Sequence, residues 1–206
     1  GTTLADADGL GTIGYQWQSS TDGNTWIDIG GAANISLTLT EAQVGRQVRA
    51  VASYTDGHNT VESITSAATA VVANGNDLPT GTVGVGGTAM QGQTLTASNT
   101  LADADGLSAI GYQWQADGIA IGGATASTLV LAEAQVGKVI SVNASYTDGH
   151  GTVESITSAA TAVVANLNDA PSGEVGVVGT AIQGQILTAG TTLADADGLG
   201  TIGYQW

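Results

Sequence analysis

The chain has 206 residues and a formal net charge of −15 at pH 7, from 18 acidic and three basic residues. This charge argues against nucleic acid as a partner, because phosphate backbones are bound by basic surfaces. Cysteine is absent, which excludes thiol catalysis and disulfides, and no apolar run approaches roughly 18 residues, so we expect no membrane insertion of this segment.

The sequence repeats itself with the period of a whole small domain. Residues 61–74 recur unchanged at 153–166, 92 positions later, and residues 1–17 recur at 190–206. Such a period indicates tandem copies of one domain rather than the shorter units of a solenoid. We expect three segments: a repeat lacking its first strand or strands (1–77), a complete repeat (78–169), and the first three strands of another (170–206).

The complete repeat should contain about seven short strands. Tyr112 and Trp114 alternate with polar residues in a pattern typical of a half-buried strand. Ala116–Gly118 carries a hairpin-turn signal, and residues 132–137 resemble a single helical turn at a corner. In chain order, we expect strands near residues 83–85, 95–97, 110–115, 119–121, 129–131, 140–146 and 153–164.

This pattern predicts an all-β fold of tandem immunoglobulin-like β-sandwiches without disulfides. Trp114, on the third strand, should pack in the core, and an exposed tryptophan that stacks on sugar is the alternative. The first repeat has a longer hairpin, residues 19–29, with its own Trp26. We expect this insertion to be structural, with ligand binding as the alternative.

Acidic and amide side chains gather where successive repeats should meet. In an immunoglobulin-like topology, each linker leaves one domain beside the loops at the near pole of the next. The residues expected at the first junction are Asn74, Asn76, Asp77, Asp103, Asp105 and Asp148. Those expected at the second are Asn166, Asn168, Asp169, Asp195 and Asp197. Glu41 and Glu133, on the corner turns, are within reach of the same places.

So many acidic oxygens in one place repel one another unless a cation joins them. Ca²⁺ accepts six to eight oxygen ligands in flexible geometry, whereas Mg²⁺ demands a tight octahedron. The sequence therefore predicts calcium at the junctions. The alternative is that each Asp-Ala-Asp-Gly segment, such as residues 103–106, is only a turn.

No catalytic constellation stands out, so we expect no enzyme activity. Serine, histidine and acid do not fall into a nucleophile motif, and no phosphate-binding loop is present. His58 and His150 occupy equivalent loops of different repeats. We interpret them as solvated loop residues, with a metal ligand near Asp56 or Asp148 as the alternative.

Several motifs together resemble a known family. GYQWQADG, IGGAT, LAEAQVGK and SYTDG, in this order, resemble the immunoglobulin-like tandem repeats of large bacterial RTX-type surface adhesins. The linkers are similar to those of cadherins, in which an Asn-Asp element before a proline and an Asp-Ala-Asp segment of the next domain surround calcium. Asn76, Asp77, Asp103 and Asp105 match that pattern. The cadherin acidic-basic-acidic corner motif and the RTX nonapeptide repeats are missing.

The resemblance implies an extracellular extender on the bacterial cell surface. Such repeats form an elongated rod, stiffened by Ca²⁺, that holds a binding tip away from the cell for attachment or biofilm formation. Neighbouring repeats are the expected partners. Head-to-tail self-association is a further expectation, because residues 170–206 supply first strands that residues 1–77 lack. The alternative function is a glycan- or protein-binding module of a surface protein.

Overall fold

The structure is a computed structural model that describes residues 4–206. The chain divides into two compact units. Unit 1 comprises Gly1–Leu78 together with two loops of the second repeat, Asp103–Gly106 and Gly149–Thr152. Unit 2 comprises Pro79–Ala102, Leu107–Asp148 and Val153–Trp206. Several linker and loop residues with predicted metal roles therefore fall within the same unit.

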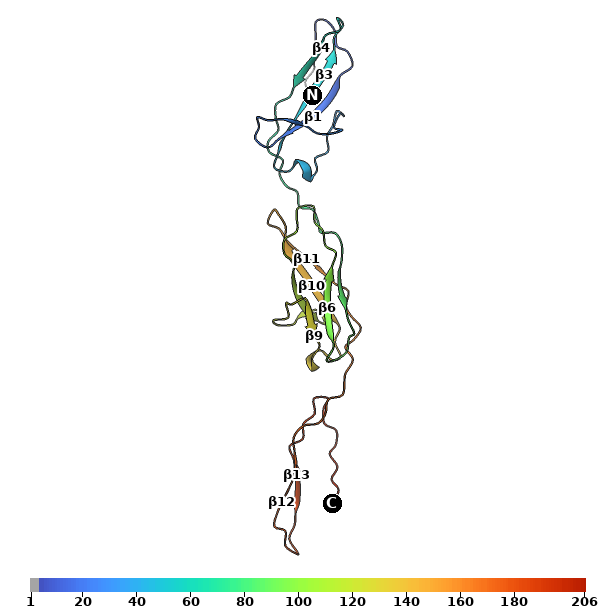
Figure 1. The fold of residues 1–206 in the computed structure, drawn as a ribbon, viewed down its shortest axis with the longest axis vertical. Helices are drawn as coiled ribbons and strands as arrows, with labels where there is room; N and C mark the ends of the chain where they lie inside the picture. The colour runs from blue at the N-terminus through green and yellow to red at the C-terminus, as the bar shows by residue number, and fades with distance from the viewer. Residues whose placement is uncertain (1–3) are drawn as a thin grey trace. The chain divides into compact units, whose positions relative to one another are not determined.

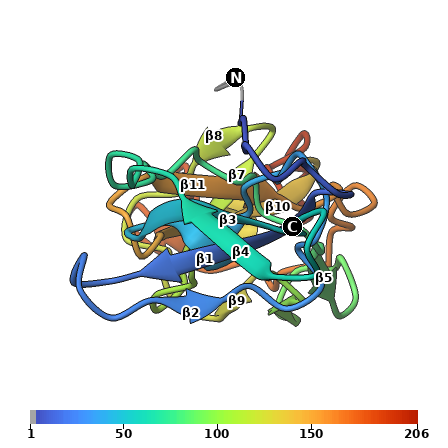
Figure 2. The ribbon, with the colours of Figure 1, turned by 90° about the horizontal axis from the view of Figure 1, so that it is seen from above.

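Unit 1 contains one antiparallel sheet in the order β2-β1-β3-β4 (Figure 2). Its strands are β1 (Gly14–Ser20), β2 (Ile27–Asp28), β3 (Gln47–Thr55) and β4 (Val61–Thr65), and a 3-10 turn, η1, spans Glu41–Gln43. Val48 and Tyr54 are buried on β3. Arg49 stacks over the Trp26 ring, 4.2 Å from its centroid, so the residues of the longer hairpin are tied to the sheet by a cation–π contact.

The second repeat, in unit 2, is a sandwich of two antiparallel sheets (Figure 1). One sheet has the order β5-β6-β9 and the other β11-β10-β7-β8. This is the strand arrangement of immunoglobulin-type sandwiches, and it confirms the all-β prediction. The strands are β5 (Val83–Gly86), β6 (Thr94–Asn99), β7 (Gly111–Ala116), β8 (Ile119–Ala120), β9 (Thr128–Val130), β10 (Ile140–Thr147) and β11 (Val153–Thr157), with a 3-10 turn η2 at Glu133–Gln135.

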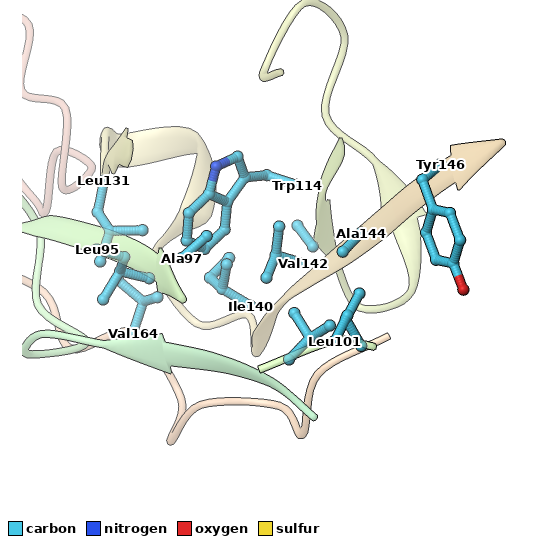
Figure 3. Close-up of a cluster of buried hydrophobic side chains, with 12 residues drawn as sticks. Leu95, Ala97, Leu101, Trp114, Leu131, Ile140, Val142, Ala144, Tyr146 and Val164 are labelled. Atoms are coloured by element: carbon cyan, nitrogen blue, oxygen red, sulfur yellow. The ribbon is translucent and has the colours of Figure 1, made fainter. Parts of the chain in front are cut away.

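The core of this sandwich lies between its two sheets and centres on Trp114, which is fully buried. Figure 3 shows its indole beside Ala97 and Leu131, with Val142 close by. The indole Nε1–H donates a hydrogen bond of 2.9 Å to the carbonyl oxygen of Ala126, so the ring is buried without leaving its polar group unpaired. The prediction that Trp114 packs in the core is confirmed. Burial of each large aliphatic neighbour contributes about 1.5–3 kcal/mol.

The hairpin between β7 and β8 forms where the sequence predicts it. Asp117 has φ = 50° and Gly118 has φ = 79°. Two successive residues with positive φ are the signature of a type I′ turn, whose twist matches that of the flanking strands. Aspartate and glycine are among the residues that adopt this conformation at least cost.

The last strand is shorter than predicted, because β11 ends at Thr157 and not near residue 164. The chain still follows β10 after that point, but serine and threonine hydroxyls replace carbonyl acceptors. The backbone N–H of Val142 donates to Ser158 Oγ, and that of Ile140 donates to Thr161 Oγ1. Side-chain acceptors of this kind compete with the regular ladder. Ser141, which lies between these two residues of β10, is also buried.

The third repeat forms one antiparallel hairpin, β12 (Val175–Val178) with β13 (Thr188–Thr191). Residues 201–206, expected to be a third strand, have no regular structure. In the second repeat the equivalent strand, β7, pairs with β8 and β10, and residues 170–206 hold no counterpart of either. Within residues 4–206, no helix has the length and apolar character that crossing a bilayer requires.

Candidate metal centres

Each Asp-Ala-Asp-Gly segment is a turn built by its first aspartate. The Oδ1 of Asp103 accepts a hydrogen bond from the backbone N–H of Asp105 (2.9 Å), and its carbonyl accepts one from Gly106 (3.2 Å). Asp195 makes the same pair of bonds with Asp197 and Gly198 (2.9 and 3.1 Å). This arrangement is an Asx-turn. It fixes the backbone and leaves the side chain of the second aspartate to point elsewhere.

In unit 1, the second aspartate of this turn meets the linker and the corner turn. The backbone N–H of Asp77 donates to Asp105 Oδ2 at 2.6 Å. Ligand atoms of Glu41, Asp105 and His150 all lie within 4.8 Å of one another, and His150 Nε2 is 3.5 Å from Glu41 Oε1. We call this set site 1. Glu41 and Asp77 also line a hollow of about 230 Å³ beside the linker.

Site 1 contains an acceptor that protein groups do not satisfy. Asp105 is only 5% exposed, and its Oδ1 has no hydrogen-bond partner. The buried Oδ1 of Asn74, on the linker, is likewise unpaired. Unpaired buried acceptors are rare in folded proteins because each costs about 1–3 kcal/mol, and more when charged. A bound cation would satisfy the Asp105 oxygen.

The loop that carries His150 is held against Asp105 by its preceding glycine. The N–H of Gly149 donates to the backbone carbonyl of Asp105 at 2.9 Å. A Cβ on Gly149 would lie 2.5 Å from that same oxygen, which is closer than van der Waals contact allows. The close approach therefore requires glycine at this position.

Unit 2 contains an equivalent arrangement, which we call site 2. Ligand atoms of Glu133, Asp169 and Asp197 lie within 4.8 Å of one another. The backbone N–H of Asp169 donates to Asp197 Oδ2 at 2.8 Å, as that of Asp77 does to Asp105 in site 1. The other oxygen of Asp197 accepts from Asn166 Nδ2 (2.9 Å), and Gln91 Nε2 donates to Asp169 Oδ2 (2.8 Å). All three ligand groups of site 2 are carboxylates.

The predicted ligands differ in what they do in the structure. Five of them supply ligand atoms to sites 1 and 2: Glu41, Asp105, Glu133, Asp169 and Asp197. Asp103 and Asp195 form the turns, Asp77 contributes its backbone N–H, and Asn166 bonds to Asp197. Asn76 and Asn168 donate from their amides to the carbonyl of the next residue, at 3.3 and 2.9 Å. Asp148 is buried in unit 2, and within residues 4–206 it belongs to neither grouping.

Sequence reasoning missed two groupings in the first repeat. One consists of Asp8, Asp56 and His58, and the other of Asp6, Asp56 and Glu62. Their signal was the repeat itself, since Asp8 and His58 are the counterparts of Asp105 and His150. His150 was expected to be a solvated loop residue, with a metal ligand near Asp148 as the alternative. The structure groups it instead with Glu41 and Asp105.

A tyrosine hydroxyl organises the second of these groupings. Tyr54 Oη lies 2.6 Å from Glu62 Oε2 and 2.9 Å from Asp6 Oδ2. The hydrogen bond to the Glu62 carboxylate, followed by that to Asp6, raises the pKa of Tyr54. The pKa of Asp6 is lowered, chiefly by the backbone N–H of Asp8 and then by the Tyr54 hydroxyl. Tyr54 therefore stays protonated and helps to keep Asp6 ionised.

Comparison with known proteins gives a match to the first part of the chain. Residues 1–75 match a protein-family model described as "Domain of unknown function (DUF8696)". Neither the curated proteins nor the solved structures contain a match to the chain.

Proposed function

We propose that this chain is an extender segment of a bacterial cell-surface adhesin, in which calcium bound at the linkers stiffens a row of immunoglobulin-like domains. The row is an elongated rod outside the cell that projects a binding tip for attachment or biofilm formation. The resemblance of the repeat motifs to RTX-type adhesin repeats supports this proposal. Neighbouring repeats of the chain are the partners that it requires.

The observation that carries the proposal is the recurrence of one arrangement in both units. In each, a glutamate of the corner turn, a linker aspartate and the second aspartate of an Asp-Ala-Asp segment come together. A cation held there would connect the corner of one repeat, the linker and the loop of the next repeat. Repetition of this arrangement fits a spacer built from like units.

The donor set fits calcium. Sites 1 and 2 together offer carboxylates from five residues, and the Asp105 Oδ1 atom is a buried acceptor with no protein donor. Carboxylate, amide and water oxygens are the ligands that Ca²⁺ takes at 2.3–2.6 Å. Water can complete the coordination, since Ca²⁺ accepts six to eight oxygen ligands.

The first test is calcium titration of the 206-residue chain by calorimetry, with thermal unfolding in calcium and in chelator. Calcium that binds only the folded state stabilises it by RT ln(1 + [L]/Kd), about 2.7 kcal/mol at a hundredfold excess over Kd. Asp105→Asn and Asp197→Asn should each remove part of this gain. Asp28→Asn is the matched control, since it removes one charge from a residue outside these groupings. Unchanged melting curves in chelator would refute the calcium sites.

The second test is small-angle scattering, which measures stiffness. Small interfaces between domains allow relative motion by default, so the maximum dimension should be larger and better defined in calcium than in chelator. Identical profiles, from samples in which calorimetry shows bound calcium, would count against the extender. Light scattering at high concentration tests the head-to-tail association, and specific binding on a glycan array would favour the alternative binding module.

A further inference from the structure

Site 1 differs from site 2 in one ligand, the imidazole of His150. Its Nε2 lies 3.5 Å from Glu41 Oε1, and the two side chains are 38% and 35% exposed. The third member, Asp105, is almost completely buried, with an Oδ1 that no protein donor reaches. The site therefore combines two carboxylates, one of them buried and incompletely satisfied, with a nitrogen donor.

A nitrogen donor changes which ions the site can hold. Calcium takes oxygen ligands, whereas imidazole suits zinc, copper, nickel and iron. Zinc is bound by histidine nitrogen and by aspartate and glutamate oxygen, and its open sites hold three protein ligands with water in the fourth position. Site 2 offers only carboxylates and lacks this donor.

One distance in site 1 is close to the value that a tetrahedral ion needs. With metal–ligand bonds of about 2.0–2.1 Å, neighbouring ligand atoms of a tetrahedron are about 3.4 Å apart. The Glu41–His150 pair is already at 3.5 Å, and no pair in the site exceeds 4.8 Å. Rotation of the exposed glutamate and histidine side chains can supply the remaining movement, since Asp105 is held by Asp77 and by the loop of Gly149.

The first repeat provides a weaker version of the same pair. His58 Nδ1 lies 3.6 Å from Asp8 Oδ1, but these side chains are 75% and 59% exposed. Side chains so exposed must lose more conformational entropy when they bind an ion. Site 1 is therefore the better candidate, and a His58→Gln background removes the competing pair.

We infer that Glu41, Asp105 and His150 bind a transition-metal ion of the Zn²⁺ class, which competes with calcium at site 1, while site 2 binds calcium alone. This inference rests on the proposed function, because site 1 is also a proposed calcium site. It adds that one linker of the chain responds to a second class of ion.

The test uses the whole chain in a His58→Gln background, so that the weaker pair does not contribute. Zn²⁺ binding is measured by calorimetry at neutral pH, and Co²⁺ is used as a probe whose visible absorption reports nitrogen and oxygen ligands. His150→Gln should weaken Zn²⁺ binding by about tenfold or more, the scale of effect seen when a metal site loses ligand support. The calcium affinity of the same variant should be unchanged. Asp105→Asn should weaken the binding of both Zn²⁺ and Ca²⁺.

The outcomes separate this inference from the proposed function. Calcium binding without measurable Zn²⁺ binding, or Zn²⁺ affinity that changes by less than about twofold in His150→Gln against the tenfold expected, would overturn the inference and leave the calcium sites standing. If the unmodified chain binds neither Ca²⁺ nor Zn²⁺, both this inference and the proposed calcium sites are refuted. Zinc that displaces calcium from site 1 but not from site 2, seen as loss of one calcium per chain, is the result that we expect.

Discussion

Truncation of Trp114 should unfold the second repeat at moderate temperature. The indole is fully buried, packs between both sheets and donates one hydrogen bond to Ala126. Replacement of a buried tryptophan with alanine costs about 3–5 kcal/mol. Domains of this size lose about 4–8 °C of melting temperature per kcal/mol. Trp114→Ala should therefore lower the melting temperature of this repeat by at least about 12 °C.

Hydrogen exchange is the appropriate assay, because amides of β7 and β10 report on the second repeat alone. Trp114→Phe retains an aromatic ring and loses the N–H donor. It should reduce the stability of the repeat less than Trp114→Ala does, because it leaves a smaller cavity. Trp206→Ala is the control, since that side chain is 76% exposed. If Trp114→Ala and Trp206→Ala have the same effect on exchange, Trp114 is not the centre of the core.

Two further predictions concern the loops. Gly149→Ala places a Cβ against the carbonyl of Asp105, so it should destabilise site 1 and reduce the calcium response in a titration. Gly122→Ala is the control, because a Cβ there meets no atom within 4 Å, and it should change neither. Equal calcium responses of the two variants would contradict the role of Gly149. Tyr54→Phe should raise the pKa of Asp6 toward its ordinary 3.8, as measured by NMR titration of the carboxyl carbon. Because the pKa of Asp6 is lowered in the folded state, its ionised form stabilises the protein above pH about 4, and this contribution is lost as the pH falls through the folded value. The stability difference between the unmodified chain and the Tyr54→Phe variant should therefore be largest near neutral pH and shrink in acid, and a difference that grows in acid would contradict this reasoning.

The fold was predictable where local chemistry and tertiary packing agree. The alternation around Tyr112 and Trp114 indicated β7, and the Asp117-Gly118 pair specified the turn that follows it. The end of β11 was not predictable from its apolar residues, because Ser158 and Thr161 look like ordinary strand residues. Only the structure shows their hydroxyls accepting from β10.

The sequence predicted where the candidate sites lie better than it predicted which groups line them. Topology alone puts linker and loop acids together, and the structure brings Glu41 to Asp105 and Glu133 to Asp197. Topology could not show that Asp77 would use its backbone N–H, because a sequence gives the side chain but not which group of a residue faces its neighbour. The position of His150 beside Glu41 and Asp105 was not predicted for a related reason, since a lone histidine in a polar loop carries no spatial information.

The identity of the strands β4 and β11 has a consequence for how the protein can be made. Both read Val-Glu-Ser-Ile-Thr, and both pair with a preceding Ala-Ser-Tyr-Thr segment in the same register, Tyr54 opposite Glu62 and Tyr146 opposite Glu154. At four of the five pairings the side chains do not distinguish the correct partner from the copy 92 positions away. At the fifth, Thr65 faces Val51 and Thr157 faces Asn143. Short loops favour the local partner through a high effective concentration, and synthesis from the ribosome presents one copy at a time. Refolding of the whole chain from denaturant presents both copies at once, and strand exchange between repeats is then the characteristic error.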